Sequence, residues 1–429
     1  MGTTYEKIGL LDHTGFGNMG DAATLAAFIE NIRKRLPNTI LVGFSSNPND
    51  TRERHDIPSY PIRWSYPGWD LPDGAPAGAA VRKSKLKSAM KRFPRFYASM
   101  AAVLHLAREA AHLLRSYRVL KSLDLLIIAG GGQLCDLWRG PWALPYGVFK
   151  FCLLARLSGT KLLILNVGAG PLKHPASKFL AKWSVRLADY ISFRDAESQV
   201  LLQSAGCTAI THVYADTAYS LCLGNYLAKG PSVTAMPTVG LNIMGYCDPR
   251  LWPRKDSAVY CRYLDKIAAF SSRLLAANYR IEVFTSDILV DRHAIADLEK
   301  KLSGRIAPER IANIAYRPVT GLEELLAQMA GFDFVITSKF HGVIFSHLLA
   351  RPVIALSYDP KINHLMRKAG HSRYCLDIEH FDLSSLETAF TSLTKDAHDI
   401  RAQLRRVVAT HSDMLRRQFD SIFGGQATA

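Results

Sequence analysis

The 429-residue sequence lacks the features that define several protein classes. Its seven cysteines are scattered and form no CxxC pair, which argues against a disulfide framework or a zinc site and favours a reducing cytoplasm. The most apolar stretch, residues 143–165, is interrupted by Lys150, Arg156 and Lys161, so it predicts a helix and a buried strand and not a membrane span. The N-terminal residues carry no signal-peptide pattern. We also expect no metal and no cofactor, because no ligand cluster stands out.

Acidic residues are scarce as well. The chain has 37 Asp and Glu against 53 Lys and Arg, a formal charge of +16. Such an excess favours nucleic acid, an anionic membrane surface or a small anionic substrate as partner. Much of it lies between Arg82 and Lys121, where apolar residues recur at helical spacing. That pattern is typical of a basic amphipathic helix on anionic lipid, or of an ordinary solvated helix. No nucleic-acid motif accompanies the charge, so we expect no nucleic-acid partner.

What the sequence does contain is two successive rounds of strand and helix patterns, and its length fits two domains. Near-continuous apolar strands that end in small residues are typical of parallel sheets covered on both faces. We therefore predict an α/β protein with an N-terminal domain over 1–226, a C-terminal domain over 235–385 and C-terminal helices over 386–429. Residues 48–80 lack periodicity and are typical of a surface excursion. Together with the basic helical stretch that follows them, they form an expected insertion at about 48–121.

Two parallel α/β domains imply a cleft, with ligands bound beyond the carboxyl ends of the strands. The first such strand end carries the loop GFGNMGD, residues 15–21. Its glycines let a ligand approach the backbone, and the following helix offers free N–H groups to an oxyanion. It is not a Walker loop or a strict GxGxxG. A plain tight turn with Asp21 near the helix N-terminus is the alternative.

Three further strand ends carry glycine or charge. Gly130, Gly131 and Gly132 precede Asp136, which could serve as a base toward a sugar hydroxyl or as a helix cap. The run GAGP at 168–171 indicates only a turn. Arg194, in SFRD, offers a fork suited to carboxylate or phosphate, or a structural pair with the neighbouring aspartate.

The richest strand end is Thr337-Ser338-Lys339-Phe340-His341-Gly342. It places a cation, an imidazole and helix N–H groups within one turn. Histidine exchanges a proton near neutral pH, and its polar neighbours favour a functional over a core role.

The order of these segments resembles the polysaccharide pyruvyl transferase family from Gly15 to about Lys361. The resemblance is carried, in chain order, by GxGNxGD, GGGxxxD, GxGP, ISFRDAES, YADTAYSL, SKFHG and RPVIALSYDPK. The main departure is Lys339, where the family more often has arginine; lysine keeps the charge but loses the bidentate fork. Residues 48–121 are not covered.

The resemblance implies two Rossmann-like domains facing across a cleft, as in GT-B glycosyltransferases, and transfer of a pyruvyl group from phosphoenolpyruvate to a sugar as a cyclic ketal. On this hypothesis His341 is the general acid and Asp21 or Asp136 the base on the acceptor hydroxyl. The C-terminal domain would hold the donor and the N-terminal domain the acceptor. The expected donor-binding residues are Arg194, Lys339, Ser338 and Gly342, and the expected acceptor-binding residues are Gly17, Asn18, Gly20, Gly131 and Gly132.

Two alternatives remain open on the residues alone. A GT-B glycosyltransferase would use a nucleotide sugar and a late carboxylate to hold its ribose, for which Asp359 is eligible. A membrane-associated scaffold would need no catalytic site, but polar residues at five strand ends argue against it.

For the pyruvyl transferase, the expected acceptor is a sugar of a cell-surface polysaccharide or of its lipid-linked precursor. The expected location is the cytoplasm, free or peripheral at the inner face of the membrane.

Overall fold

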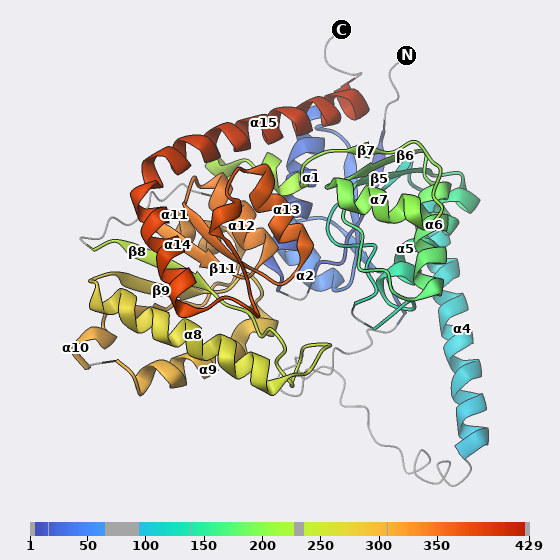
Figure 1. The fold of residues 1–429 in the computed structure, drawn as a ribbon. Helices are drawn as coiled ribbons and strands as arrows, with labels where there is room; N and C mark the ends of the chain where they lie inside the picture. The colour runs from blue at the N-terminus through green and yellow to red at the C-terminus, as the bar shows by residue number, and fades with distance from the viewer. Residues whose placement is uncertain are drawn as a thin grey trace.

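A computed structural model describes residues 5–15, 17–64, 94–137, 139–226, 236–306 and 308–424. Within them the chain forms two parallel sheets, each flanked by helices, that lie side by side (Figure 1). The two-domain α/β expectation is thus confirmed.

The first sheet has seven parallel strands in the order β3-β2-β1-β4-β5-β6-β7. Its strands are β1 (Lys7–Leu11), β2 (Ile40–Ser45), β3 (Ser59–Pro61), β4 (Leu125–Ala129), β5 (Lys161–Val167), β6 (Tyr190–Phe193) and β7 (His212–Val213). β1 is central, so Ile8 pairs with Leu41 on one side and Leu125 on the other.

Both faces of this sheet are covered, which explains the continuous apolar strands. Alternate residues of β4 enter different cores: Leu125 packs with Phe28, and Leu126 packs with Phe151. Phe28 belongs to α1 (Met19–Arg35). Phe151 belongs to α5 (Leu144–Ser158), which is flanked by α4 and α6. The other helices of this part are α2 (Pro48–His55), α4 (Pro94–Leu120), α6 (Pro175–Leu187) and α7 (Ala196–Ser204).

The second sheet has six parallel strands in the order β10-β9-β8-β11-β12-β13. They are β8 (Thr238–Asn242), β9 (Arg280–Phe284), β10 (Ile314–Tyr316), β11 (Phe334–Thr337), β12 (Val353–Ser357) and β13 (Cys375–Asp377). Its helices are α8 (Ser257–Ala276), α9 (Ile288–Ser303), α10 (Pro308–Ile311), α11 (Leu322–Ala330), α12 (Phe340–Leu348), α13 (Pro360–Lys368) and α14 (Leu383–Lys395).

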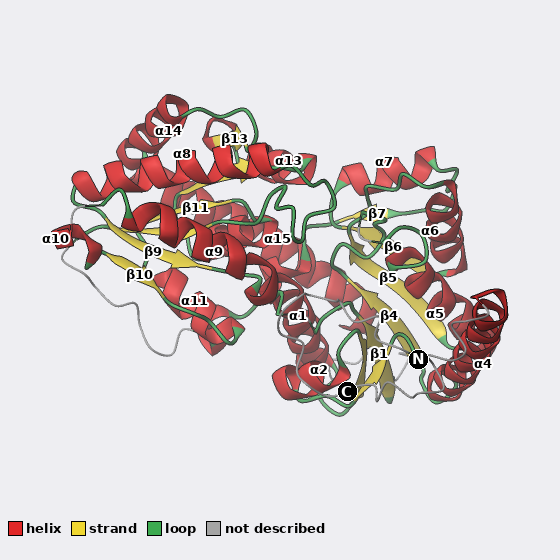
Figure 2. Cartoon of the chain, turned by 90° about the horizontal axis from the view of Figure 1, so that it is seen from below, coloured by secondary structure: helices red, strands yellow, loops and turns green. Residues whose placement is uncertain are grey.

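The last helix, α15 (Ala397–Phe423), joins the two halves. Leu404 and Leu415 belong to the core of the second domain, whereas Phe419 and Phe423 pack in the core of the first. Figure 1 shows α15 running along both domains to end near the N-terminus, and Figure 2 shows the two sheets from below. The C-terminal helices therefore tie the domains together and do not form a unit of their own.

Most local expectations are confirmed. Residues 143–165 form the end of a turn, α5 and the start of β5, as predicted. The surface excursion from residue 48 is wrong over its first part, because α2 packs against β2 and β3 adds an edge strand to the sheet. The second part of the basic stretch forms the helix α4, as expected, while residues 65–93 lie outside the described part. Residues 227–235, at the expected boundary between the domains, also lie outside it.

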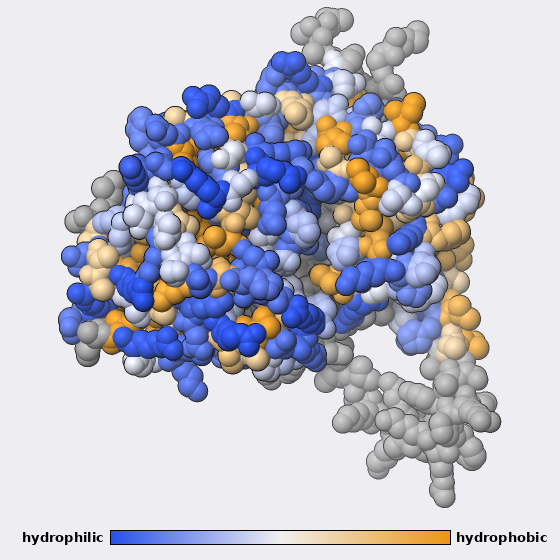
Figure 3. All heavy atoms as spheres, viewed as in Figure 1, coloured by the Kyte–Doolittle hydropathy of each residue, from blue (hydrophilic) through white to orange (hydrophobic). Residues whose placement is uncertain are grey.

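The face shown in Figure 3 is mostly hydrophilic, but apolar side chains gather along α4. In the described ranges no helix combines the length and the hydropathy that crossing a bilayer requires.

Candidate active site

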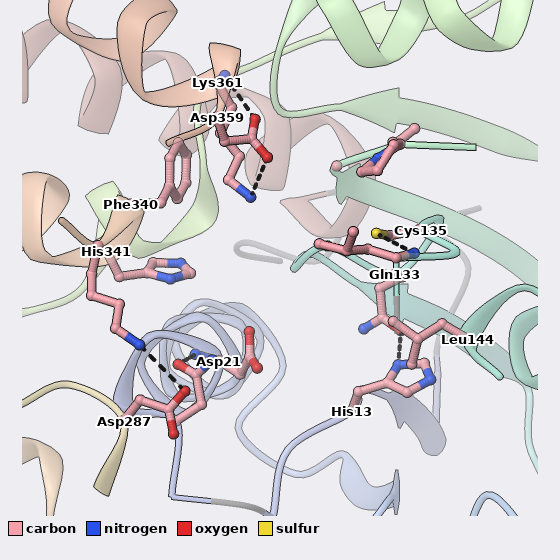
Figure 4. Close-up of a pocket in the computed structure, with 18 of the residues that line it drawn as sticks. His13, Asp21, Gln133, Cys135, Leu144, Asp287, Phe340, His341, Asp359 and Lys361 are labelled. Carbon is pink, nitrogen blue, oxygen red and sulfur yellow. Dashed lines mark hydrogen bonds and ion pairs between the residues drawn. The ribbon is translucent and has the colours of Figure 1, made fainter. Parts of the chain in front are cut away.

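A cavity of about 920 Å³ lies between the carboxyl edges of the two sheets. It is lined by residues that follow β1, β4, β5 and β6 of the first domain and β8, β9, β11 and β12 of the second. This is the edge at which open α/β sheets bind ligands. Figure 4 shows His341 and Lys361 on one side of the cavity and His13 and Gln133 on the other, with Asp21 and Asp287 close together beneath them.

The glycine loop before α1 connects the two domains. Met19 donates its backbone N–H to Ser286 O at 2.8 Å, and Ile288 N–H donates to Gly17 O at 3.1 Å. Gly17 has a φ of +74°, which a side chain would strain. Asn18 caps α1 by accepting from the N–H groups of Gly20 and Asp21, and it also lines the cavity. The loop therefore fixes the position of α1 against the second domain at the site.

His341 lies at the start of α12, with its ring packed against Gly20 of α1. A Cβ on Gly20 would come within 2.0 Å of His341 Nδ1, so only glycine leaves room for the imidazole. Nε2 lacks a hydrogen-bond partner and lies 3.9 Å from Asp216 Oδ2. Burial lowers the pKa of His341 to about 4, and the nearby cations Arg194 and Lys361 act in the same direction, while Asp216 opposes them. The imidazole is therefore neutral at pH 7.

Arg194 reaches from β6 across the domain boundary to the second domain. Its guanidinium carbon lies 4.4 Å from the centre of the Phe340 ring, and Nη1 donates to Asp216 Oδ2 at 3.0 Å. A Cβ on Gly168 would lie 2.5 Å from Arg194 Nε, so this glycine makes space for the side chain. Nε itself is buried without a hydrogen-bond partner. Nε does lie 3.6 Å from Asp195 Oδ2, so Asp216 and Asp195 both pair with the guanidinium.

Lys361 shares the Phe340 ring with Arg194. Its Nζ lies 6.0 Å from the ring centre and 3.3 Å from Asp359 Oδ2, at the start of α13. Burial would lower the pKa of Lys361, but Tyr358 and Asp359 outweigh it and raise the pKa. Two cations from different domains therefore flank one aromatic side chain at the cavity wall.

Lys339 also lines the cavity, but two carboxylates hold it. Nζ lies 2.8 Å from Asp291 Oδ1 and 3.6 Å from Asp287 Oδ2. Burial alone would lower the pKa of Lys339, yet these two aspartates raise it, so the lysine is charged and its charge is offset.

Asp21 faces the cavity from the first turn of α1. Burial raises its pKa to about 6, Asp287 and Asp216 add to the rise, and Arg194 and Lys361 oppose it. A carboxyl group with this pKa is largely ionised at pH 7 and can accept a proton.

Comparison with known proteins identifies the family. The model of the polysaccharide pyruvyl transferase family matches residues 18–360 of the chain. The chain belongs to the polysaccharide pyruvyl transferase family. It is therefore a member of a transferase family, and the segments on which the resemblance was based lie almost wholly within the matched residues.

Solved structures that are similar to this pyruvyl transferase family member share its fold. The UDP-GlcNAc 2-epimerase from Methanocaldococcus jannaschii has a TM-score of 0.58 and 12% sequence identity, with 90% of this chain and 92% of that chain covered. The putative UDP-N-acetylglucosamine 2-epimerase from Listeria monocytogenes has a TM-score of 0.60 and 12% identity, with 93% and 91% covered. These neighbours have the GT-B fold, so the expected GT-B-like arrangement of two Rossmann-like domains is confirmed.

Several residues expected at the site of this family member lie elsewhere. Asp136 Oδ2 accepts from the backbone N–H groups of Lys173 and His174, each at 2.8 Å, and is absent from the cavity lining, so it fixes a loop. Ser338 is fully buried and is hydrogen-bonded to Tyr263. Gly342 packs against Thr337, where a Cβ would come within 2.3 Å of its hydroxyl oxygen.

Of the glycines expected at the site, some line the cavity and others do not. Gly132 lines the cavity, whereas Gly131 and Gly20 are outside its lining. The role of Gly20 is to admit the His341 ring. Gly131 adopts a φ of +67°, and a Cβ on it would lie 3.8 Å from Oδ1 of both Asp12 and Asp21. Sequence patterns marked these glycines because sterically required glycines and ligand-facing glycines look identical in a motif.

Sequence reasoning missed Lys361 and the polar group His13, Gln133 and Asp12. His13 Nδ1 is hydrogen-bonded to Gln133 Oε1, and Gln133 Nε2 donates to Asp12 Oδ1 at 3.1 Å. The signal for Lys361 was its place after a strand end, in SYDPK. His13 and Asp12 likewise follow β1 directly. Across the described ranges, no group of three or more His, Cys, Asp or Glu side chains is arranged to hold a metal ion.

Proposed function

We propose that the protein transfers a pyruvyl group from phosphoenolpyruvate to two hydroxyls of a sugar, which gives a cyclic pyruvate ketal. The observation that carries the proposal is the group formed by Arg194, Lys361 and His341 around Phe340 in the cavity. Family membership supports the transferase class. The donor, the acceptor and the roles of the residues are the content of the proposal.

Phosphoenolpyruvate carries a carboxylate and a phosphate, and this part of the cavity offers two cations within reach of one small ligand. Arg194 stacks on Phe340 at the cavity wall, and a guanidinium there suits a charge-assisted hydrogen bond to the donor. Lys361 is partly exposed and reaches the same space. Lys339 lines the cavity as well, and Asp291 and Asp287 offset its charge. Asp216 and Asp195 offset that of Arg194 in the same way.

The proposed reaction balances as an addition and a substitution. The C3 methylene of phosphoenolpyruvate gains a proton and becomes the methyl group, while one sugar hydroxyl loses its proton and bonds to C2. The second hydroxyl then displaces phosphate at C2 and its proton leaves with the phosphate. The products are one ketal and one hydrogen phosphate, with no change of oxidation state.

In this scheme His341 delivers the proton to C3. The free imidazole is neutral at pH 7, since its pKa is about 4. A bound dianion would raise that pKa, because opposite charge favours the protonated ring. Binding of the donor would thus favour the protonated form of His341, which is the form that acts as the general acid. Asp21, with a pKa of about 6, serves as the base toward the first hydroxyl.

The acceptor is proposed to lie on the first-domain side, near Asn18 and Gly132. This end of the cavity also contains Arg63 and Arg139. Burial lowers the pKa of Arg63, and the nearby charge of Arg139 lowers it further. Two neighbouring cations suit an anionic acceptor, such as a saccharide carried on a lipid phosphate. The protein would then act in the cytoplasm, peripheral at the inner face of the membrane.

The test is ligand-specific stabilisation followed by turnover. Phosphoenolpyruvate at 100 times its Kd should stabilise the protein by about 2.7 kcal/mol, whereas UDP-sugars should not. Transfer is then measured as phosphate release that depends on a sugar with neighbouring hydroxyls, with the ketal identified by mass spectrometry. Stabilisation by a UDP-sugar and not by phosphoenolpyruvate would instead support the GT-B glycosyltransferase.

Two variants separate binding from catalysis. Lys361→Gln should weaken phosphoenolpyruvate binding at least about ten-fold, since a charge-assisted contact is lost. His341→Gln should abolish most turnover, by roughly a hundred-fold or more, and leave donor binding near normal. Lys300→Gln, in α9, is the matched control for loss of a lysine charge remote from the cavity. Unchanged turnover in His341→Gln would remove the general-acid role.

A further inference from the structure

The outward side of α6 carries two exposed aromatic rings. Phe179 is 57% exposed and Trp183 is 39% exposed, and their ring centres lie 6.0 Å apart one helical turn from each other. The inward side of the same helix is buried through Leu180, Ala181 and Val185. Exposed aromatic pairs of this size on an otherwise well-covered helix commonly mark an interaction surface.

The neighbouring helices extend this apolar surface. On α5, Leu153 and Leu157 are 37% and 65% exposed and lie one turn apart. On α4, Leu106 is 71% exposed and Leu114 is 60% exposed. α5 packs against both α4 and α6, and Figures 1 and 2 show the three helices on the same side of the first domain.

The charge on these helices is almost entirely positive. Glu109 is the single acidic residue in the sequences of α4, α5 and α6, and its carboxylate is bonded to Lys150 and Tyr146 at 3.0 Å each. The exposed cations among the apolar residues are Arg108, Arg115, Arg118, Arg156, Lys178 and Arg186, of which Arg156 pairs with Asp189 at 3.0 Å. Arg186 also stacks on Trp183, with its guanidinium carbon 5.1 Å from the ring centre.

We infer that this α4–α5–α6 face is the surface by which the protein docks on an anionic lipid bilayer. Aromatic and leucine side chains would enter the interfacial region while arginine and lysine contact the lipid phosphates, the combination that interfacial binding requires. A second copy fits less well, because a two-fold contact through this face would oppose cations with cations.

The face adjoins the cavity. α5 begins at Leu144 and α6 follows shortly after Lys173, and both of these residues line the cavity. Docking would therefore hold the cavity rim close to the bilayer, where a lipid-carried acceptor is found. The inference places the membrane contact of the proposed function on specific residues, but it does not depend on the donor, since vesicle binding needs no phosphoenolpyruvate.

The experiment is co-sedimentation of the purified full-length protein with vesicles. Binding is measured with phosphatidylcholine alone and with phosphatidylcholine containing 30% phosphatidylglycerol, at about 50 and 500 mM NaCl. The wild-type protein should bind the anionic vesicles and lose most of that binding at high salt, as expected from screening of surface charge. Absence of binding to anionic vesicles at low salt would overturn the inference.

Two double variants assign the surface. Phe179→Ser/Trp183→Ser should reduce partitioning at least about five-fold, because apolar insertion is lost. Ile40→Ser/Ile311→Ser removes two exposed apolar residues, 58% and 51% exposed, outside this face and should bind as the wild type does. Equal binding by both double variants, or a wild-type dimer that Phe179→Ser/Trp183→Ser splits, would refute the lipid assignment. Transfer to a soluble sugar is measured in parallel, so loss of docking and loss of chemistry remain distinguishable.

Discussion

At the scale of single residues, the cavity depends on glycines that make room for the side chains that line it. Gly20 lies in the first turn of α1, where alanine is preferred over glycine by up to about 1 kcal/mol for helix formation. Its Cβ would nevertheless collide with the His341 ring. Gly168 plays the same part under Arg194. At Gly20, helix preference and packing against the cavity therefore oppose each other.

Gly20→Ala should lower the stability by about 1–3 kcal/mol, the usual cost of overpacking a buried contact. It should also lower the proposed pyruvyl transfer by roughly a hundred-fold, because the imidazole must move out of its position. Gly304→Ala, where a Cβ meets no atom within 4 Å, is the control and should keep full activity. The measurement is a double-variant cycle: Gly20→Ala should add little to His341→Gln. Additive losses would mean that Gly20 acts independently of the histidine.

The ionisation of His341 gives a second prediction at this scale. Burial and neighbouring cations hold its pKa at about 4 in the free protein. Inorganic phosphate bound beside it should raise that pKa by at least about one unit, because a nearby anion favours the protonated ring. NMR titration of labelled histidine, with His341→Gln to assign the signal, measures both values. An unchanged pKa in saturating phosphate would place the anion away from this ring.

At the scale of elements, α15 is the part that the domains share. Phe419 is 1% exposed and packs edge-on against Phe28 of α1, with ring centres 5.6 Å apart. Arg35 of α1 reinforces the contact, with Nε donating to Asp420 Oδ1 at 2.8 Å. The last turns of α15 thus complete the core of the first domain.

Phe419→Ala should cost about 3–5 kcal/mol of stability, the usual range for removing a buried phenyl ring. Met414→Ala on the same helix, where the side chain is 37% exposed, should cost under about 1 kcal/mol. Thermal unfolding of both variants checks the difference. Equal and small shifts would mean that α15 contributes little to the core of the first domain.

At the scale of the whole molecule, a buried cluster of histidines at the domain junction makes the stability of the protein depend on pH. His347 Nδ1 is hydrogen-bonded to Tyr219 OH at 2.7 Å, and the Tyr219 ring also contacts His411 of α15. Burial lowers the pKa of His347 to about 3, and it lowers the pKa values of His371 and His411 as well. All three are therefore neutral in the folded protein.

Because these folded pKa values lie below the unfolded value of about 6.5, their stabilisation is complete above pH 6.5 and is lost as the pH falls below it. His347 alone should cost up to about 2 kcal/mol between pH 6.5 and 5. Tm measured across that range should fall in the wild type and fall less steeply in His347→Gln. Parallel curves would assign the acid sensitivity to other groups.

How far the sequence reaches is clear from particular segments. Continuous apolar strands such as β4 and β5 were predictable, because burial on both faces requires side chains without polar groups. The edge strand β3 was not, because three residues ending in proline carry no periodicity. At the site, Asp21, Arg194 and His341 were found from their places after strands, and all three line the cavity.

Sequence alone determined the two parallel α/β domains, the family and several strand ends that supply residues to the cavity, because these depend on local periodicity and on the order of motifs. Only the tertiary structure decided which polar residues face the cavity. Asp136 and Ser338 sit in the same kinds of motif as Asp21 and His341, but hydrogen bonds within the fold occupy them. The hydrogen-bond partner of each polar residue depends on which distant parts of the chain the fold brings together, and a local sequence pattern carries no information about those contacts.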